Sequence, residues 1–418
     1  MDAFLINGKK NLAGKVIISG AKNAILPLMT ATLLAEGNSV LHNVPNINDF
    51  KMMSHLLRII GARVEHENEI MQIDSTNASY WEAPYELVSK MRASIYVLGP
   101  LLGRFKKALV AFPGGCAIGT RPVDLHLMAM ERLGAKITIE HGYIKAECPK
   151  GLSGAEIEFP FISVGATANT LMAAVLAKGK TVLKNIALEP EIDSLISFLN
   201  QMGAKISKTE DNFLEIEGVK KLKPVEMTMI PDRIEAGTLL LCSAITGHTF
   251  TVCNCEPRHL ESLIQKMEQA GCSFKITDDE ITVYPASKIK SVDIVTEAYP
   301  GFPTDLQAQF MAYMTLAKGK SHFKDTIFPD RFMHVAELNR LGANIQMKDG
   351  IAIVTGVEKL SGAEVMATDL RASAALVLAG LAAEGETTIS RIYHIDRGYE
   401  KIEKKLTSIG AEIKRIIL

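Results

Sequence analysis

Residues 134 to 139 read Gly-Ala-Lys-Ile-Thr-Ile, a glycine followed by a short β-branched segment, and this junction recurs along the chain. A Gly-Ala or Gly-Cys pair ends an amphipathic segment at intervals of 73, 69, 68, 71 and 68 residues by subtraction, at Gly61, Gly134, Gly203, Gly271, Gly342 and Gly410. Each glycine suits the left-handed position that closes a helix, and the residues after it predict a strand.

Between these junctions each unit predicts the order βαβαββ. In the first unit, Asn48 or Asp49 is expected to cap the second helix. The apolar residues from Phe50 to Ile60 fall on one face of that helix. A period near seventy residues is too long for a thin solenoid and fits a small subdomain.

Six units are enough for two domains of three, and a chain of 418 residues exceeds the usual size of a single core. The last unit ends in one strand (411–418), which residues 4–6 or 16–18 near the chain start can partner. We therefore expect an N-terminal domain over 21–229 and a discontinuous C-terminal domain of 1–20 plus 230–418. Two chain crossings favour a hinge, with a site in the cleft between the domains.

The composition is that of an ordinary globular protein, with 47% apolar residues, 22% charged residues and a net charge of −1. This charge argues against a nucleic-acid binder with a basic face. The longest apolar run (24–35) is too short to cross a bilayer, and the first residues show no export signal. We expect a cytoplasmic protein without membrane insertion.

Six cysteines at unrelated spacings do not predict a disulfide scaffold. Cys253-Asn-Cys255 lacks the spacing and the second ligand pair of a zinc site, so both cysteines are interpreted as strand residues. No metal ligand set is expected.

Residues 113 to 122 read Pro-Gly-Gly-Cys-Ala-Ile-Gly-Thr-Arg-Pro and form an insertion relative to the first unit. The glycines allow the backbone to approach a ligand closely. The thiol of Cys116, with an unperturbed pKa of about 8.5, can donate a proton and recover it. Arg121 can hold a phosphate or carboxylate through two hydrogen bonds. The alternative is a surface loop with an incidental cysteine, but an insertion on a repeated scaffold favours a lid.

Basic residues recur where helices are predicted to begin, at Lys22, Arg92, Arg121, Arg331, Arg371 and Arg397. A helix N-terminus already carries partial positive charge, so a cation there costs roughly a few tenths of a kcal/mol. Such a repeated choice is expected where an anionic ligand is bound. The alternative is that each cation pairs with a neighbouring aspartate, as Asp330-Arg331 or Asp396-Arg397 can.

Motifs over the whole chain resemble those of the bacterial UDP-N-acetylglucosamine 1-carboxyvinyltransferases. They are Ser19-Gly-Ala-Lys-Asn-Ala, Met91-Arg-Ala-Ser, Pro113-Gly-Gly-Cys, Gly119-Thr-Arg-Pro-Val-Asp-Leu-His126, Phe302-Pro-Thr-Asp305, Arg331-Phe-Met-His, Ala367-Thr-Asp-Leu-Arg-Ala-Ser and Asp396-Arg-Gly-Tyr. The resemblance implies an α/β fold of two inside-out, barrel-like domains, each with three βαβαββ units. It also implies transfer of enolpyruvyl from phosphoenolpyruvate to the 3′-OH of UDP-N-acetylglucosamine by addition and elimination. Phosphate is released in this first committed step of peptidoglycan synthesis, and no cofactor is required.

The resemblance assigns catalytic roles to Cys116, Asp305, Lys22 and Arg397. Asp305 matches the base that takes the 3′-OH proton. Cys116 matches the general acid, which can also add covalently to phosphoenolpyruvate and would be alkylated by the inhibitor fosfomycin. Lys22, Arg121 and Arg397 match the residues that hold the phosphate and carboxylate of the donor. Whether Cys116 or Lys22 protonates C3 stays open.

Other matching positions belong to the sugar-nucleotide site, part of which lies in the N-terminal domain. Asn23 matches a position that binds the sugar and the intermediate. The lining positions are Arg92, Arg121, Pro122, Val123, Asp124, Leu125, Ser163, Val164, Gly165, Asp305 and Ile327, and the cleft residues are Arg331, Asp369 and Arg371. Asn48 and Phe161 depart from the family pattern, since many members have lysine at both positions near the nucleotide.

Two other functions remain as alternatives. A 5-enolpyruvylshikimate-3-phosphate synthase shares the fold and the donor, but it has Gly-Asp-Lys-Ser where this chain has Gly-Ala-Lys-Asn, and it lacks the Gly-Gly-Cys loop. A six-repeat DNA clamp needs a basic inner wall, whereas the cations here stand singly beside aspartates. His126, His334 and His394 lie beside the motifs and are interpreted as structural residues.

Overall fold

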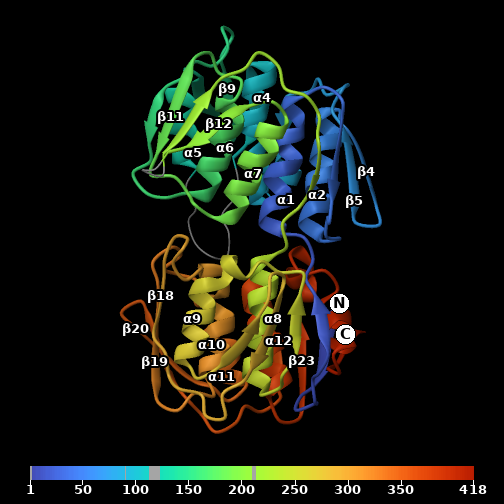
Figure 1. Ribbon diagram of the computed structural model, residues 1–418, viewed down its shortest axis with the longest axis vertical. Helices are drawn as coiled ribbons and strands as arrows, with labels where there is room; N and C mark the ends of the chain where they lie inside the picture. The colour runs from blue at the N-terminus through green and yellow to red at the C-terminus, as the bar shows by residue number, and fades with distance from the viewer. Residues whose placement is uncertain (1, 90, 113–122, 210–212) are drawn as a thin grey trace. The chain divides into compact units, whose positions relative to one another are not determined.

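The computed structural model describes residues 2–89, 91–112, 123–209 and 213–418. These residues form two compact units (Figure 1). The N-terminal unit comprises the described residues of 20–230, and the C-terminal unit comprises 2–19 and 231–418. The boundaries differ by one residue from those expected from the repeat.

Three four-stranded sheets build the N-terminal unit, and each has the same strand order. In each sheet an edge strand pairs parallel with its neighbour, which pairs antiparallel with the last strand of a hairpin. The strands, in sheet order, are β14 (Glu226–Thr228), β3 (Asn38–His42), β5 (Ile70–Asp74) and β4 (Arg63–Glu67); β6 (Glu82–Ala83), β7 (Lys107–Ala111), β9 (Tyr143–Glu147) and β8 (Lys136–Glu140); β10 (Glu156–Glu158), β11 (Lys180–Lys184), β13 (Leu214–Glu217) and β12 (Lys205–Lys208).

The C-terminal unit repeats this arrangement in three further sheets. Its strands, in the same order, are β2 (Lys15–Ile17), β15 (Thr251–Cys253), β17 (Glu280–Tyr284) and β16 (Ser273–Ile276); β18 (Ile294–Thr296), β19 (Lys320–Asp325), β21 (Ile351–Thr355) and β20 (Asn344–Lys348); β22 (Glu364–Met366), β23 (Glu386–Ser390), β1 (Asp2–Asn7) and β24 (Glu412–Ile417). The predicted βαβαββ unit and the mixed α/β class are confirmed.

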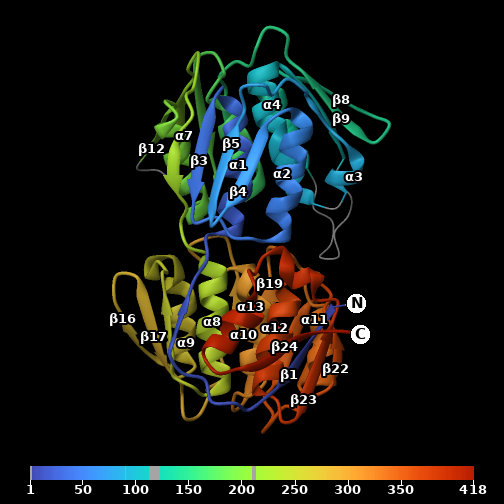
Figure 2. The same cartoon turned by 90° about the vertical axis from the view of Figure 1, so that its right-hand side faces the viewer.

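In each unit, one sheet is completed by a strand that lies far away in the sequence. β1 pairs antiparallel with β24, with Ala3 opposite Ile416, so the two chain ends lie side by side (Figure 2). This confirms that residues 4–6 partner the last strand. The other predicted segment, β2, instead pairs parallel with β15 and opens the fourth repeat. β14 completes the first repeat by pairing with β3, which was not predicted from the sequence.

Within each repeat, a first helix that lies in the core alternates with a second helix that is buried on one side only. The helices of the N-terminal unit are α1 (Lys22–Ala31), η1 (Thr32–Leu34), α2 (Asn48–Ile60), α3 (Tyr85–Val88), η2 (Arg92–Val97), α4 (Leu98–Phe105), α5 (Asp124–Arg132), α6 (Val164–Ala174) and α7 (Pro190–Gln201). Those of the C-terminal unit are α8 (Arg233–Thr246), η3 (Pro257–Leu260), α9 (Glu261–Gln269), η4 (Thr304–Leu306), α10 (Gln307–Met314), α11 (His334–Arg340), α12 (Leu370–Ala382), η5 (Ile392–Arg397) and α13 (Ile402–Ser408).

The first helix of each repeat forms the core of its unit. Every residue of α10 and α12 is buried, and these helices pack against each other and against α8 (Figure 1). A helix that is apolar on all sides must be enclosed, so the sheets lie outside the helices. Second helices such as α2 bury only one stripe. The N-terminal ends of the inner helices are therefore held by rigid packing.

The six junction glycines adopt the predicted left-handed conformation, with φ between 89° and 105°. A residue with a side chain is strained there, which explains the regular recurrence of glycine. The predicted cap of α2 is wrong. Ile47 occupies the N-cap without a side-chain hydrogen bond, and Asn48 and Asp49 lie in the first turn.

The chain crossings at residues 19–20 and 230–231 are tightly packed. The Ser19 carbonyl accepts from the backbone N–H of Asp232 at 2.9 Å. A Cβ at Gly20 would lie 1.8 Å from the Asn43 carbonyl oxygen. Only glycine fits at this point of the crossing.

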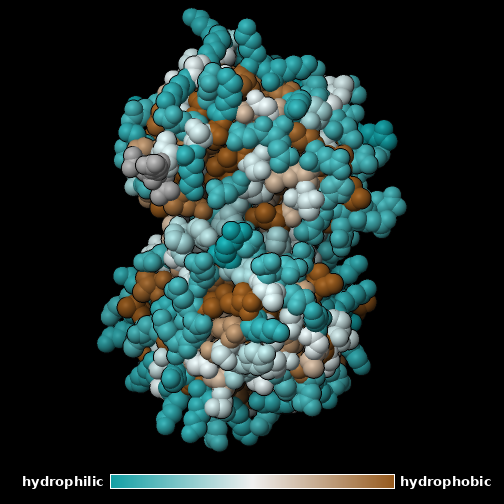
Figure 3. Space-filling model, in the orientation of Figure 1, coloured by the Kyte–Doolittle hydropathy of each residue, from teal (hydrophilic) through white to brown (hydrophobic). Residues whose placement is uncertain are grey.

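Hydrophilic side chains cover most of the face shown in Figure 3, and its described apolar residues occur in small, separate groups. Among the described residues, no helix is both long enough and apolar enough to span a bilayer.

Candidate functional site

The inner helices of the C-terminal unit each begin beside an aspartate. Asp232 and Asp369 are the N-caps of α8 and α12, where their carboxylates accept backbone N–H bonds at 2.8 to 3.1 Å. In the remaining repeat Pro303 takes the position before η4, so Asp305 lies in the first turn. Its side chain is 24% exposed, whereas Asp232 and Asp369 are buried. Of the three aspartates, Asp305 is thus the one that does not occupy an N-cap position.

Two buried arginines hold the Asp305 carboxylate. Arg331 Nη1 donates to Oδ1 and Arg371 Nη2 donates to Oδ2, each at 2.8 Å. The arginines are only 5% and 2% exposed. Burial alone raises the pKa of Asp305, but the charges and hydrogen bonds of Arg371 and Arg331 outweigh burial and hold that pKa well below its usual range. Asp305 is therefore ionised at neutral pH.

A polar cluster inside the helix core supports Arg371. Its Nη1 donates to the Tyr399 hydroxyl at 3.2 Å, which shares a hydrogen bond with Thr238 at 2.8 Å. Gln309 Nε2 donates to Thr238 at 3.1 Å and to Tyr399 at 3.3 Å. Tyr399 ends the Asp396-Arg-Gly-Tyr motif, but neither its role nor those of Thr238 and Gln309 were predicted from the sequence. The signal for Thr238 and Gln309 was a polar side chain within a buried helix.

Two histidines, His334 and His394, lie near the charged residues of the Asp305 site. His334 is buried, and its pKa is lowered to about 4 by burial and, to a smaller extent, by the charge of Arg331, against the opposing charge of Asp369. His394 is half-buried; burial and the charge of Arg397 lower its pKa, and Asp369 again raises it. The charge of Asp369 thus acts on both imidazoles, that of Arg331 on His334 and that of Arg397 on His394.

A buried carboxylate fixes the turn that carries Ile327. Asp325 Oδ1 accepts from the backbone N–H groups of Ile327 at 3.0 Å and Phe328 at 2.7 Å, and Oδ2 accepts from Thr304 at 2.6 Å. The same threonine hydroxyl accepts from Arg331 at 3.2 Å. Ile327 is 38% exposed. Through Thr304, Asp325 therefore joins this turn to Arg331, a role that was not predicted from the sequence.

The N-terminal unit holds the other predicted cations. Lys22 is the first residue of α1, and its Nζ lies 3.2 Å from Asp49 Oδ2 in α2. The Asp49 side chain is 2% exposed and that of Lys22 is 14% exposed. Asn23 follows in α1, and Arg92 begins η2. The starts of α1 and η2 belong to helices that pack together.

The start of α6 carries three of the predicted lining residues. Ser163 is the N-cap, and its Oγ accepts from the backbone N–H of Ala166 at 3.3 Å. Val164 and Gly165 follow in the first turn. Asn169, one turn further on, lies 3.0 Å from Nδ1 of the buried His126. Asn169 was also missed from the sequence.

The residues at the start of α5 lie partly in the core. Val123, the N-cap, and Leu125 are buried, whereas Asp124 is exposed. Three predicted residues, Cys116, Arg121 and Pro122, lie outside the described part of the chain, as does the rest of the proposed lid.

Three details differ from the sequence expectations. Asp396 does not pair with Arg397. Both of its carboxylate oxygens accept hydrogen bonds from Arg415, at 2.6 and 2.9 Å. Arg331 lies before α11, which begins at His334, and Arg397 ends η5 rather than beginning α13. Cys253 is a strand residue as expected, whereas Cys255 follows β15. The predicted starts of these two second helices are therefore wrong.

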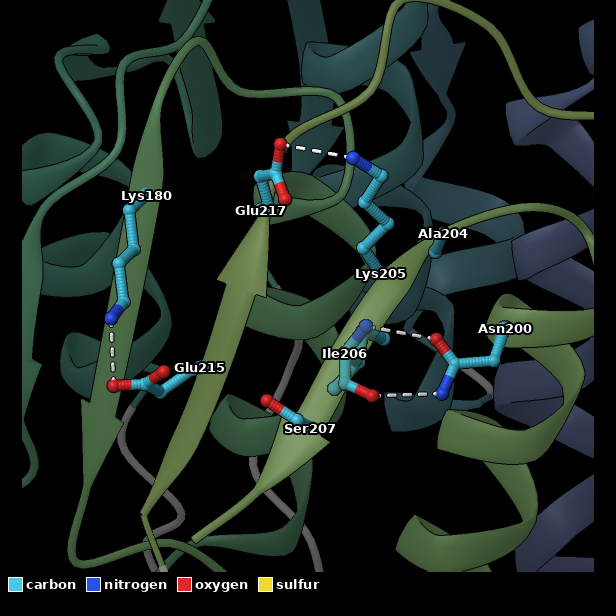
Figure 4. A pocket seen from close by; sticks show the side chains of 8 residues that line it. All are labelled: Lys180, Asn200, Ala204, Lys205, Ile206, Ser207, Glu215 and Glu217. Atoms are coloured by element: carbon cyan, nitrogen blue, oxygen red, sulfur yellow. Dashed lines mark hydrogen bonds and ion pairs between the residues drawn. The ribbon is translucent and has the colours of Figure 1, made fainter.

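A hollow of about 660 Å³ lies elsewhere in the N-terminal unit, on β11, β12 and β13. Its charged side chains pair with one another, Lys180 with Glu215 at 2.7 Å and Lys205 with Glu217 at 3.0 Å (Figure 4). Asn200 is bound to the backbone of Ile206. With its polar groups satisfied in this way, the hollow has the character of an ordinary sheet surface. The described residues also contain no group of His, Cys, Asp or Glu suited to a metal ion.

Comparison with known proteins decides the family. The family described as EPSP synthase (3-phosphoshikimate 1-carboxyvinyltransferase) matches residues 6–406. The UDP-N-acetylglucosamine 1-carboxyvinyltransferase of Chloroherpeton thalassium is 54% identical over 99% of this chain and 97% of its own length. The chain belongs to the UDP-N-acetylglucosamine 1-carboxyvinyltransferase family. The enzyme of the same name from Bdellovibrio bacteriovorus is 52% identical over 99% of this chain and all of its own.

Two solved structures of enolpyruvyl transferases share the fold. The enolpyruvyl transferase NikO from Streptomyces tendae superposes with a TM-score of 0.90 at 24% identity, covering 99% of this chain and 98% of its own. The EPSP synthase of Acinetobacter baumannii gives a TM-score of 0.76 at 19% identity, with both chains fully covered. The two-unit, inside-out α/β architecture is thus that of the enolpyruvyl transferases.

Proposed function

We propose that the protein transfers enolpyruvyl from phosphoenolpyruvate to the 3′-OH of UDP-N-acetylglucosamine, releasing phosphate in the first step of peptidoglycan synthesis. The curated relatives that are 51–54% identical over nearly the full chain carry this activity in their name. The observation that supports the chemistry most directly is Asp305, an ionised and partly exposed carboxylate on a rigid helix start. In the proposal it removes the 3′-OH proton.

The cations of the site suit a donor that carries both a phosphate and a carboxylate. Lys22, Arg121 and Arg397 are proposed to hold these groups, as the resemblance implies. Arg331 and Arg371 have spare donors, since a guanidinium carries five N–H groups. The Nε atom of each is buried and bonds to none of the described residues. Buried cations stabilise developing negative charge more strongly than solvated ones.

Protonation of C3 and covalent chemistry are assigned to the loop outside the described residues. Cys116 is proposed as the general acid and as the residue alkylated by fosfomycin, with Lys22 as the other possible proton donor. The loop is proposed to close after UDP-N-acetylglucosamine binds, which removes water from the reacting centre. The proposed setting is the cytoplasm, and the reaction as proposed uses no metal or organic cofactor.

The lining residues named in the sequence analysis are proposed to bind the sugar nucleotide. Ser163, Val164 and Gly165 present the N-terminus of α6, where free N–H groups favour phosphate oxygens. Asn23 and Arg92 are proposed to contact the same ligand. Asp369, an N-cap, is proposed to orient the start of α12 rather than to react.

The test is a phosphate-release assay with phosphoenolpyruvate and each of two acceptors, UDP-N-acetylglucosamine and shikimate 3-phosphate. We expect turnover only with the sugar nucleotide, and mass spectrometry should find the enolpyruvyl group on that acceptor. Turnover with shikimate 3-phosphate alone would show that the protein is an EPSP synthase. Retention of DNA at physiological salt without turnover would favour the clamp.

A further inference from the structure

Among the described residues, three carboxylates from three different elements bind the side chain of Arg415 in β24. Its Nη1 and Nη2 donate to the two carboxylate oxygens of Asp396, at 2.9 and 2.6 Å. Nη1 also donates to Asp2 at 3.3 Å, and Nε donates to Glu403 at 3.4 Å. The two bonds to Asp396 are the shortest and engage both oxygens, which is the strongest geometry for an arginine and a carboxylate. Asp396 is therefore the principal partner of Arg415.

The pairing of β24 with β1 directs this side chain to the inner face of the sheet (Figure 2). Arg415 lies opposite Phe4 in the antiparallel register, so the two side chains project from the same face. Phe4 is fully buried, and the Arg415 guanidinium lies 5.2 Å from the centre of its ring. A guanidinium that packs on an aromatic ring and is held by carboxylates has little rotational freedom.

Asp396 connects Arg415 to the turn that carries Arg397. The two residues Asp396 and Arg397 end η5. A short 3₁₀ helix has few and weak internal hydrogen bonds, so the position of its last residues depends on what they contact. Arg415 holds this turn before Arg397, through Asp396. Arg371 holds it after Arg397, through the Tyr399 hydroxyl at 3.2 Å.

Arg415 also keeps like charges together. Asp2, Asp396 and Glu403 each accept a hydrogen bond of 3.4 Å or less from the guanidinium. Without this cation the carboxylates would repel one another. β1 is fixed by hydrogen bonds to two strands and α13 by its own helical hydrogen bonds. The end of η5 is therefore the part that is expected to shift when the guanidinium is removed.

We propose that Arg415 is a positioning residue for Arg397, acting through Asp396, and that it thereby sets the affinity of the protein for phosphoenolpyruvate. The inference rests on the proposed function, because it takes Arg397 as a residue that holds the donor. It gives the last strand of the fold a part in donor binding, which was not predicted from the sequence.

The test is the dependence of phosphate release on each substrate in Arg415→Met. Methionine keeps an apolar stem beside Phe4 but donates no hydrogen bond. A binding group that is misplaced by about 1 Å can cost up to about 10²-fold, and Tyr399 still holds the other side of the turn, so we expect the KM for phosphoenolpyruvate to rise about tenfold. The turnover number and the KM for UDP-N-acetylglucosamine should stay within about twofold of the wild type, because binding lost equally from ground and transition states leaves kcat unchanged.

Three further single variants separate this role from general packing. Arg415→Lys restores the charge but not the two parallel hydrogen bonds, so its KM for phosphoenolpyruvate should lie between those of the wild type and Arg415→Met. Asp2→Asn and Glu403→Gln are the matched controls, because each removes a carboxylate from the same guanidinium and neither residue adjoins Arg397. Both should keep this KM within about twofold of the wild type.

A double variant tests whether Arg415 acts through Asp396. Asp396→Asn has one acceptor oxygen in place of two and should raise the KM for phosphoenolpyruvate by itself, which keeps the inference testable if Arg415→Met does not fold. Residues that act through one contact are not additive, so the KM of Arg415→Met/Asp396→Asn should be no higher than that of Arg415→Met. Effects that multiply would show that the two residues act independently and would overturn the inference.

The outcomes separate the inference from the proposed function. A wild-type KM for phosphoenolpyruvate in Arg415→Met, with or without a loss of thermal stability, overturns the role of Arg415 and leaves the transferase proposal intact. An equal rise in the KM of both substrates, or the same rise in Asp2→Asn and Glu403→Gln, also overturns it, because the effect is then one of general packing. A wild-type protein that releases no phosphate from the two substrates contradicts both proposals.

Discussion

Replacing Arg331 with methionine tests how the arginines control Asp305. The change removes the 2.8 Å hydrogen bond to Oδ1 and leaves the bond from Arg371 to Oδ2. Methionine keeps an apolar stem of similar length in a site that is 5% exposed. Thr304 keeps its bond to Asp325 at 2.6 Å, so the turn is preserved. Besides the charge on one side of the carboxylate, the variant loses only the 3.2 Å hydrogen bond from Arg331 to Thr304 among the hydrogen bonds described for this side chain.

The size of the effect follows from the charge that is lost. A neighbouring cation lowers the pKa of a carboxylate, so the pKa of Asp305 should rise in Arg331→Met. A hydrogen bond to a charged group contributes about 1.5 to 3 kcal/mol, and the variant should lose this much folding free energy at pH 7.

The sign of the pH dependence can be worked out for Asp305. Its pKa in the folded protein lies below that of the unfolded chain, which is about 3.9. Its contribution to stability is therefore present above about pH 4 and disappears as the pH falls through the folded value. The difference in stability between wild type and variant should be constant near neutrality and should shrink in acid.

Two assays measure these effects. The acidic limb of kcat/KM for phosphate release should move to higher pH in the variant, because the pKa of Asp305 rises when the Arg331 charge is lost. Urea unfolding at pH 7 should show the loss of stability. Arg258→Met is the control, because Arg258 also pairs with a carboxylate, Glu256, but is 82% exposed. It should change stability by less than about 1 kcal/mol. An Arg331→Met enzyme with an unshifted acidic limb and wild-type stability would refute the reasoning.

Three further changes test other parts of the site. Lys22→Met removes the cation 3.2 Å from the buried Asp49 carboxylate, so thermal unfolding should show a loss of about 3 kcal/mol and phosphate release should fall; unchanged stability would contradict this ion pair. Gly20→Ala places a methyl group 1.8 Å from the Asn43 carbonyl oxygen and should cost at least about 2 kcal/mol in urea unfolding, whereas a neutral effect would show that the crossing is loosely packed. Cys116→Asp should keep activity but form no fosfomycin adduct by mass spectrometry, and an adduct at that position would exclude the thiolate as the alkylated group.

The repeat made most of the fold predictable. Glycine at a left-handed position is a local requirement, so six such glycines revealed the helix ends without any knowledge of tertiary structure. That the last strand pairs near the chain start followed because an unpaired strand needs a partner, but the choice of β1 over β2 came from the structure. The role of β14 did not follow, because three residues at an edge carry no pattern of their own.

The candidate site was only partly predictable from the sequence. Charged residues at helix starts stand out, and Asp305, Arg331 and Arg371 are indeed in contact. The groups that support Arg371, which are Tyr399, Thr238 and Gln309, come from three different repeats and bond one another across the helix core. No sequence spacing encodes such contacts, because they depend on how the helices pack.

The central claim is that Asp305 takes the proton of the acceptor hydroxyl. Its most direct measurement is the single-turnover rate of phosphate release by Asp305→Ala, together with the affinity of this variant for UDP-N-acetylglucosamine. General-base catalysis contributes about 10² to 10⁴ in rate, so release should fall by that factor while the sugar nucleotide still binds within a few-fold of the wild type. Phosphate release at a near-normal rate from a variant that binds the nucleotide would contradict the account.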